Sequence, residues 1–571
     1  MKDYYDINEL SSKVPDPPVS NLPIEEKAKM EFGPLTSNKW LSVAQLDPNE
    51  EIKPSILDEP PYFIVLTTYL DYLVFLLIGH CKDFFGMLLM PQYFSALVAK
   101  DGYPPWYSAF ESFYPRRLKR RLDDCFARPI HGVPGRFMNC FNRATPDYNE
   151  SFRYDGTSTP CLNLSSYNYL GFAQSVGKCT EDSIEAVKKY GLSSCGPRNL
   201  IGNTDLHQNT ERILSKFIGK EDSILFSMGW GTNAHLFSSM VNSKCLVISD
   251  SLNHASIRFG IRLSGAAVKV FPHNDMNALE KLLRESISQG QSKSHRPWKK
   301  IFVCVEGLYS MEGTYCNLPG LVSLRNKYHF YLFVDEAHSI GALGEHGRGI
   351  CEYFNINPNN IDILMGTLTK SFGAAGGYIS ANKNIIDRLR LDITANNYSE
   401  SMPPAVLQQI STSMRIIAGE LNGNEGKERL QRIAFNSRYL RLGLKRLGYI
   451  IYGADDSPVI PLLLYNPSKM PGFSRKMLER GVAVVIVGYP ATDVISSRIR
   501  FCMSSALTKE DIDRILAISA DIGDELNLKF STGIAGGEKN PGDWKKGIRP
   551  RWSIEEVLAK TPEDCKKKVL Y

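Results

Sequence analysis

The chain has 571 residues, which is too long for one small domain and fits a large enzyme of several lobes with extensions. Its 67 Lys and Arg residues against 61 Asp and Glu residues give a formal net charge of +6, too small a surplus to indicate a nucleic-acid-binding protein. The 12 cysteines contain no C-x-x-C pair, so neither a zinc site nor a disulfide framework is expected, and the thiols fit a reducing compartment.

Residues 1–59 are predicted to form a mostly irregular N-terminal arm, because prolines stand there among charged residues without a periodic apolar pattern. These prolines are Pro15, Pro17, Pro18, Pro23 and Pro34. The first residues are polar and lack the apolar core of a signal peptide, so no cleavable signal is expected.

Residues 60–125 are predicted to be a membrane-associated helical segment. Residues 62–81 are apolar and nearly as long as a bilayer crossing requires, but Asp71 lies near their middle, where a charge costs about 2.5 to 3.5 kcal/mol. The segment therefore either crosses the membrane or lies in its interface, and a helix buried in protein is the third alternative. Aromatic residues followed by the basic run at 116–121 suit anionic headgroups and favour membrane attachment.

From about residue 155 strands alternate with helical patterns, which predicts an α/β fold with a mainly parallel central sheet and helices on both faces. We expect the large domain, together with a linker, to cover residues 126–420. Its candidate strands are apolar runs at residues 245–249, 267–271, 301–305, 330–334, 361–365 and 377–380.

The most informative stretch is residues 365–378, a buried strand end followed by a turn rich in hydroxyls and glycines with Lys370 at its centre. Lysine is rarely buried, so Lys370 is either solvated at a strand end or held inside for its amine. An amine whose pKa is lowered by burial or nearby cations can form a Schiff base.

Three further places could serve such a lysine. Asp335 ends a neighbouring apolar strand, where its carboxylate can pair with the ring nitrogen of pyridoxal phosphate (PLP). His254 follows another strand and is either an ordinary hydrogen-bonded histidine or a ring that stacks on the cofactor. The turn at Gly229 and Trp230 precedes a helix expected to begin near Ala234; it could bind an anion, although a simple tight turn explains its glycines equally well.

Residues 335–338 spell Asp-Glu-Ala-His, which also occurs in helicases. A helicase needs G-x-x-x-x-G-K-[ST] upstream to hold ATP phosphates, and the chain contains no such run. Nucleotide hydrolysis is therefore not expected.

After about residue 420, charged helical sequence leads into strands predicted at 449–452, 459–463 and 482–487, which indicates a smaller C-terminal domain over residues 421–530. Residues 531–571 form a basic tail rich in Gly and Lys. Ser553 and Glu556 have the spacing of a capping box and predict a short helix there.

Five motifs stand out in the central region, at residues 168–171, 253–256, 306–313, 335–339 and 366–377. Together they resemble the α-oxoamine synthase family of PLP-dependent enzymes. More closely, residues 296–300, 347–349 and 367–378 are similar to the lysine-bearing second subunit of the eukaryotic members that make long-chain bases. The resemblance covers about residues 60–528 and implies the PLP-dependent transferase fold of type I, with a smaller α+β C-terminal lobe.

The resemblance also implies roles for single residues. In that family the lysine matching Lys370 carries PLP, the aspartate matching Asp335 pairs with the ring nitrogen, and the histidine matching His254 stacks on the ring. His338 would approach the phenolic oxygen, and Arg500 would bind the amino-acid carboxylate. The residues implied near the cofactor phosphate are Thr367, Thr369, Gly229 and Trp230.

Three departures from the family pattern concern how substrate is held. Gly488 stands where bacterial relatives carry a second arginine before a Pro-Ala-Thr loop. Residues 195–198 are more similar to the partner subunit, and Leu507 replaces a histidine that relatives usually have. They bear on carboxylate handling and substrate positioning, not on the cofactor chemistry.

The activity implied by the resemblance is a PLP-dependent acyl transfer. L-Serine would condense with a long-chain acyl-CoA, palmitoyl-CoA, to give 3-ketosphinganine, coenzyme A and carbon dioxide, the first step of sphingolipid synthesis. The alternatives are a family member that joins glycine or alanine to a short acyl-CoA, against which the apolar segment argues, and a non-catalytic scaffold subunit, which would lack Lys370.

The partners implied are a lysine-lacking first subunit in an obligate heterodimer, small regulatory membrane subunits, and the lipid membrane. The location implied is the endoplasmic reticulum membrane, with the catalytic domain on the cytosolic side. Ser399 would then face the partner's site, which holds no cofactor.

Overall fold

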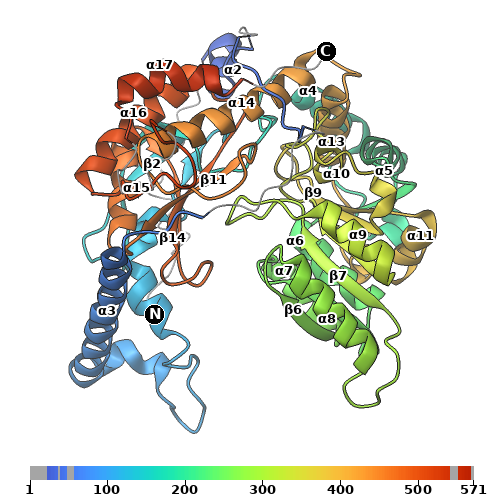
Figure 1. The fold of residues 1–571 in the computed structure, drawn as a ribbon, viewed down its shortest axis with the longest axis horizontal. Coiled ribbons are helices and arrows are strands. Elements are labelled where there is room, and N and C mark those ends of the chain that lie inside the picture. Colours follow the sequence, from blue (N-terminus) through green and yellow to red (C-terminus); the bar gives the residue numbers. More distant parts are fainter. Residues whose placement is uncertain (1–21, 36–38, 48–56, 541–550, 567–571) are drawn as a thin grey trace.

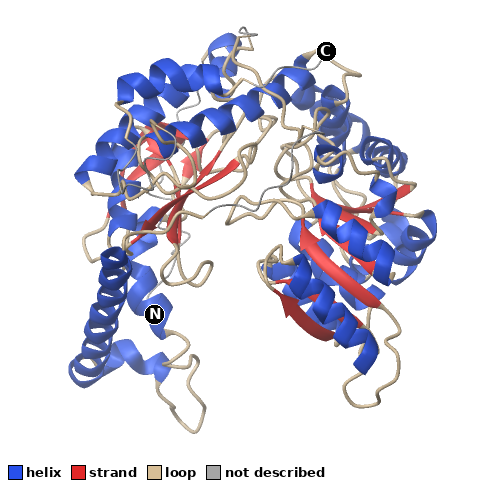
Figure 2. Cartoon of the chain, viewed as in Figure 1, coloured by secondary structure: helices blue, strands red, loops and turns tan. Residues whose placement is uncertain are grey.

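The structure is a computed structural model that describes residues 22–35, 39–47, 57–540 and 551–566. Figure 1 shows two main bodies joined by helices and loops: one holds the largest sheet, and the other holds two smaller sheets under the long C-terminal helices. Figure 2 shows helices on both sides of the large sheet, as the sequence predicts.

The central sheet has seven strands in the order β4-β10-β9-β8-β7-β5-β6. In this sheet β10 alone runs antiparallel to its neighbours β4 and β9, so the predicted mainly parallel sheet is confirmed. The strands are β4 (Asp222–Phe226), β5 (Leu246–Asp250), β6 (Ala267–Phe271), β7 (Ile301–Glu306), β8 (Tyr331–Asp335), β9 (Ile363–Thr367) and β10 (Gly377–Ala381).

The strands inside the sheet are mainly apolar because both faces of the sheet are covered there. Successive residues enter different cores: Val303 packs with helices α5 (Asp205–Ile218) and α13 (Pro404–Ile417), while Cys304 packs with α6 (Gly229–Met240), α7 (Ala255–Ser264) and α11 (Lys383–Asp392). Burial on both faces is typical of parallel sheets and explains the continuous apolar runs in the sequence. Helices α8 (Met276–Gln289) and α9 (Leu318–Tyr328) complete the first layer.

The second body contains a three-stranded antiparallel sheet in the order β11-β14-β13 and a four-stranded sheet in the order β1-β2-β3-β12. Its strands are β1 (Ile130–His131), β2 (Phe137–Ala144), β3 (Arg153–Asn163), β11 (Val459–Tyr465), β12 (Val482–Ala483), β13 (Val485–Val487) and β14 (Ser497–Cys502). The main helices over them are α14 (Glu425–Arg446), α15 (Lys469–Glu479), α16 (Lys509–Glu525) and α17 (Ile554–Asp564).

Two strand predictions in this body need correction. Residues 449–452 form no strand and contribute one isolated bridge between Ile451 and Leu462. The run at 482–487 divides into β12 and β13, which belong to different sheets. The helix predicted after Ser553 is α17, with the expected capping box to Glu556.

The apolar N-terminal segment forms one helix, α3 (Tyr62–Leu89), of 28 residues. Its length and composition suffice to cross a membrane, and only 17% of its most apolar window is buried, so α3 is not a core helix. Figure 1 shows α3 standing out from the second body beside the segment that follows it. Ile64, Thr68 and Gly79 face the protein, and Asp71 accepts a hydrogen bond from Ser468 at 3.2 Å.

The described part of the N-terminal arm is more ordered than predicted. It contains helix α2 (Ile24–Glu31), whose last residue is buried and accepts a hydrogen bond from the backbone of Ser175 at 2.7 Å. Gly33 then donates its N–H to the carbonyl of Ala506 at 2.9 Å. These contacts hold the arm against both bodies. Residues 1–21 of the arm and the lysines at 545, 546, 567 and 568 of the predicted tail lie outside the described residues.

Candidate active site

Three neighbouring strands end at one edge of the central sheet and place the candidate residues there. Glu306 ends β7 and lies in register with Asp335, the last residue of β8. Strand β9 continues into the turn that carries Lys370, and the chain returns along β10 with Thr367 paired to Gly377. The catalytic turn is thus a loop of nine residues between two hydrogen-bonded strands, at the edge where α/β sheets bind ligands.

The amine of Lys370 lies in a poorly solvated place. Its Nζ is 5.5 Å from the ring centroid of Tyr167. Burial lowers the pKa of Lys370 to about 8, a fall that the carboxylate of Asp335 opposes and that the guanidinium of Arg500 reinforces. A lysine in this condition has a usable fraction of neutral, nucleophilic amine near neutral pH.

The carboxylate of Asp335 is 2% exposed and is held by two donors. Asn233 Nδ2 donates to Oδ2 at 2.7 Å, and the backbone N–H of Ala337 donates to Oδ1 at 2.9 Å. These two hydrogen bonds fix the direction of the carboxylate. Asp335 can therefore hold a protonated ring nitrogen.

His254 is tied to Asp335 through a chain of hydrogen bonds. Asn233 also donates to Ser256 Oγ at 3.0 Å, and Ser256 Oγ lies 2.7 Å from His254 Nδ1, which accepts the Ser256 backbone N–H as well at 3.3 Å. With Nδ1 accepting, the ring proton lies on Nε2. Burial lowers the pKa of His254, with Asp335 opposing the change, so the ring is neutral and suited to stack on a flat cofactor.

His338 follows Asp335 closely in sequence and lies on the same edge of the sheet. Its Nδ1 is 2.7 Å from the hydroxyl of Tyr169, and its ring meets Tyr167 edge-on at 5.1 Å. Burial holds the pKa of His338 well below its usual range, with Lys370 and Arg500 acting in the same direction. Because the Tyr169 hydroxyl can donate to Nδ1, Nε2 is left as a donor for a phenolic oxygen.

The turn before α6 offers a place for a phosphate. Helix α6 begins at Gly229, five residues earlier than predicted, and its cap residue Met228 makes no side-chain hydrogen bond to the first turn. A Cβ on Gly229 would come within 2.8 Å of Thr367 Cγ2, so only glycine fits there. The ring of Trp230 lies against Phe259, tilted by 46°, with 4.9 Å between ring centroids. The free N–H groups at this helix start suit an anion.

The two predicted threonines differ in position. Thr367 is buried and its hydroxyl donates to the carbonyl of Ala337 at 3.3 Å, whereas Thr369 is exposed on the turn. Thr367 therefore lies beside the Gly229 turn, and no contact of the Thr369 side chain ties it to that group.

Arg500 reaches this edge from β14 in the second body. Its guanidinium lies 4.7 Å from the ring centroid of Tyr167, and its Nη1 is 3.7 Å from Met311 Sδ. Within the described part of the chain, Arg500 forms no salt bridge. Among the described residues, its buried Nε has no hydrogen-bond partner. A cation with such weak partners is ready to bind a carboxylate in bidentate fashion.

Three residues of this site were not singled out from the sequence. Glu306 was seen only as part of a motif, although its place at the end of a predicted strand could have marked it. Asn233 and Tyr167 contact the site through the docking of α6 and of the segment after β3, which the sequence alone does not show. Of the departures, Leu507 is fully buried and its carbonyl accepts from Arg432 and Asn436, so it serves packing.

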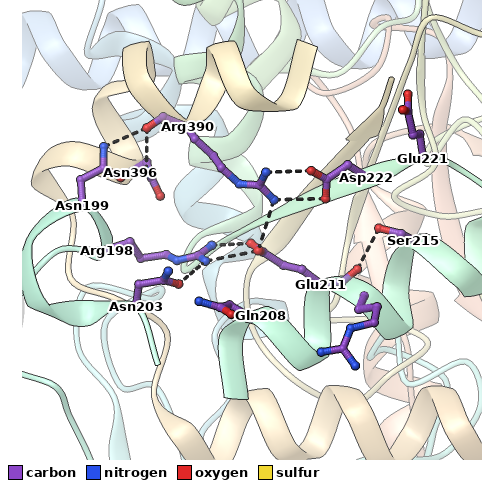
Figure 3. Close-up of a pocket in the computed structure, with 11 residues that line it drawn as sticks. Arg198, Asn199, Asn203, Gln208, Glu211, Ser215, Glu221, Asp222, Arg390 and Asn396 are labelled. Carbon is purple, nitrogen blue, oxygen red and sulfur yellow. Dashed lines mark hydrogen bonds and ion pairs between the residues drawn. The ribbon is translucent and has the colours of Figure 1, made fainter. Parts of the chain in front are cut away.

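A separate polar hollow of about 440 Å³ lies away from these residues, between α5, β4, α11 and the short η4 (Arg198–Gly202). Figure 3 shows that ion pairs fill much of its wall: Arg390 binds Asp222 through two hydrogen bonds of 2.7 and 3.1 Å, and Arg198 binds Glu211. Four of the charged side chains in its wall are thus paired with one another, and none of the residues gathered around Lys370 lines this hollow.

The residues gathered at the sheet edge fit PLP. They supply a nucleophilic lysine, an oriented carboxylate, neutral imidazoles, a helix start for the phosphate and a buried arginine that can bind a carboxylate.

Comparison with known proteins agrees with this fit. Residues 159–518 match the aminotransferase class I and II family. The chain is 60% identical to serine palmitoyltransferase 2 of Kluyveromyces lactis over 97% of this chain and 98% of that protein, and 57% identical to serine palmitoyltransferase 2 of Saccharomyces cerevisiae over the same shares. The solved serine palmitoyltransferase of S. paucimobilis with a bound PLP–myriocin aldimine gives a TM-score of 0.65 at 25% identity, covering 74% of this chain and 100% of that chain.

Proposed function

Since the chain belongs to the serine palmitoyltransferase 2 family, within the aminotransferase class I and II proteins, we propose that it is the catalytic subunit that condenses L-serine with a long-chain acyl-CoA. Palmitoyl-CoA is the acyl donor in this proposal, and 3-ketosphinganine, coenzyme A and carbon dioxide are the products. The observation that carries it is the meeting of Lys370, Asp335 and Arg500 at one edge of the central sheet.

The chain's own residues divide the work of this reaction. Lys370 would hold PLP through its neutral amine and, once released, would take the proton from Cα of serine. Arg500 would bind the serine carboxylate over the face of Tyr167 and so orient the Cα–H bond. Bound PLP supplies an electron-accepting ring that stabilises the carbanion at Cα.

The other residues keep the ring in its reactive state. Asp335 would accept a hydrogen bond from the ring nitrogen and hold it protonated, with Asn233 and Ala337 fixing the carboxylate. His254 would lie against the ring face, and His338 would donate to the phenolic oxygen. Thr367 and the start of α6, with Gly229 and Trp230, would hold the phosphate.

An assay of purified protein with a panel of amino acids and acyl-CoAs tests the proposal. The expected result is turnover with L-serine and long acyl chains, abolished by Lys370→Ala. A preference for glycine or alanine with a short acyl-CoA would support a different family member, and full turnover by Lys370→Ala would refute the proposed nucleophile.

We further propose that the partner is the lysine-lacking first subunit. Large apolar side chains stand out where η4 meets α12 (Thr394–Tyr398): Leu200 is 77% and Tyr398 81% exposed, with Ile201 and Leu391 also exposed. Exposed apolar patches of this kind mark protein interfaces. Small regulatory membrane subunits belong to the same proposal. To test this proposal, the chain is purified with and without the partner, and the molar mass of each species is measured by light scattering.

We place the enzyme at the endoplasmic reticulum membrane, with its catalytic domain on the cytosolic side. The apolar side chains of α3 that point away from the protein support attachment to lipid, because its inner face already packs on the second body. Fractionation and protease protection of the full chain test location and orientation. Recovery in the soluble fraction would contradict the proposal.

A further inference from the structure

Glu306 is a buried acid near the catalytic lysine. The reaction proposed above gives Glu306 no role. It is 3% exposed and lies in register with Asp335 on the neighbouring parallel strand. Two carboxyls side by side in a dry site repel each other when both are ionised. Among the described residues, no Lys or Arg forms a salt bridge with Glu306.

The hydrogen bonds of Glu306 lead to His254. Its Oε1 accepts the backbone N–H of His254, directly beside the imidazole that would face the cofactor ring. The neighbouring Asn253 donates its Nδ2 to the carbonyl of Cys304 at 2.7 Å and to Ser249 Oγ at 2.9 Å. Hydrogen bonds therefore hold the turn that carries His254 to the ends of β5 and β7, and Glu306 accepts one of these hydrogen bonds.

We propose that Glu306 is a positioning residue: as an uncharged carboxylic acid it holds the His254 backbone through its carbonyl oxygen and leaves Asp335 as the single anion beside the cofactor ring. The role of Glu306 beside the cofactor ring rests on the proposed function. Its uncharged state is a property of the protein without cofactor.

The groups that face Glu306 agree with an uncharged acid. Burial raises the pKa of Glu306 well above its usual range, and the carboxyl of Asp335 acts in the same direction, as does the more distant Glu312. The His254 backbone N–H and the amine of Lys370 act against this rise. The hydroxyl of Tyr309 accepts the Glu306 backbone N–H at 3.3 Å and stays protonated because burial raises its pKa.

The first test measures thermal stability of the full-chain apoprotein against pH. An acid whose pKa is raised by folding binds its proton more tightly in the folded state, so the parent loses stability as pH rises from about 4.3, the usual Glu value, towards the folded pKa. Glu306→Gln removes this loss, and its Tm should rise relative to the parent as pH increases. A difference in Tm that does not change with pH would overturn the uncharged state.

Glu211 provides the matched control, because it is equally buried but paired with Arg198 and, at 3.6 Å, with Arg390. Glu211→Gln leaves Arg198 without its counter-ion, while Arg390 keeps Asp222, and should lower the Tm across the same pH range. The two variants should therefore differ: the Tm of Glu306→Gln rises relative to the parent as pH increases, whereas the Tm of Glu211→Gln stays below that of the parent.

The second test measures PLP affinity by absorbance titration of the apoprotein. Glu306→Leu keeps the volume but removes the acceptor, which leaves the His254 N–H unsatisfied and should weaken PLP binding about 5-fold to 100-fold. Glu306→Gln restores an acceptor and should recover most of that loss. Leu binding PLP as tightly as the parent would overturn the positioning role, and Gln binding as weakly as Leu would show that the charge is required.

Neither test uses serine or acyl-CoA. If the enzyme did not turn over serine and long-chain acyl-CoA, both results on Glu306 would still hold. If the tests on Glu306 failed, the assignment of substrates would not change.

Discussion

The lowered pKa of Lys370 predicts how fast the apoprotein captures PLP at different pH values. At pH 7.5 a pKa of about 8 leaves roughly a quarter of the amine neutral, whereas the ordinary value leaves about one part in a thousand. The neutral amine is the nucleophile, so capture should be about two hundred times faster than for an exposed lysine of equal reactivity. The rate should rise tenfold per pH unit below about 8 and level off above it.

Stopped-flow absorbance of the lysine-bound cofactor, recorded from pH 6 to 10, measures this profile. Asp335→Asn removes the carboxylate that opposes the fall in pKa, so its midpoint should move to lower pH. Lys220→Met is the matched control: Lys220 is also buried, with a pKa lowered to about 8, but its Nζ donates to the carbonyl of Ile361 away from the site. A capture rate of the parent that keeps rising to pH 10 would refute the lowered pKa of Lys370. A midpoint that moves in Lys220→Met would show that the titration does not belong to Lys370.

Five further outcomes are expected. Lys370→Ala should fold, as judged by circular dichroism, but show neither turnover nor the visible absorbance of bound cofactor. Asp335→Asn should retain PLP and lose several orders of magnitude in kcat, since each pKa unit of mismatch at the ring nitrogen corresponds to about 1.4 kcal/mol; a kcat near that of the parent would exclude its role. Arg500→Gln should raise the KM for serine about 10-fold to 100-fold and change the KM for acyl-CoA little, and equal changes in both would argue against carboxylate binding. The chain produced without a partner should be poorly active and unstable, while Ser399→Ala in the complex should have a mild effect; full activity as a homodimer would contradict the heterodimer.

The strands of the central sheet could be predicted because each is an apolar run bounded by polar turns. The exception is β4, which is as long as β5 but begins with Asp222 and Ser223, so only three apolar residues remain. Residues 449–452 are apolar for another reason: Tyr449 and Ile450 are buried, and the Tyr449 hydroxyl donates to the carbonyl of Ser519, so packing and not a strand ladder accounts for them.

The start of α6 was misplaced because glycines there oppose a helix by propensity. The structure shows that Gly229 is required by the close approach of Thr367, a tertiary contact that overrides propensity. In the same way, Lys370 and Asp335 could be placed from their strands, but the meeting of Arg500 with Tyr167 depends on how two bodies dock. One sequence read alone does not contain that information.

The reversed strand β10 makes the length of the catalytic turn as important as its chemistry. Because β9 and β10 are paired from Thr367 and Gly377 onward, the loop between them is closed at its base by backbone hydrogen bonds. Adding or deleting one residue would either strain this loop or slip the register, and a slip of one residue turns every side chain of a strand to the opposite face. In the evolution of this sequence, substitutions around Lys370 should therefore be accepted far more readily than insertions or deletions.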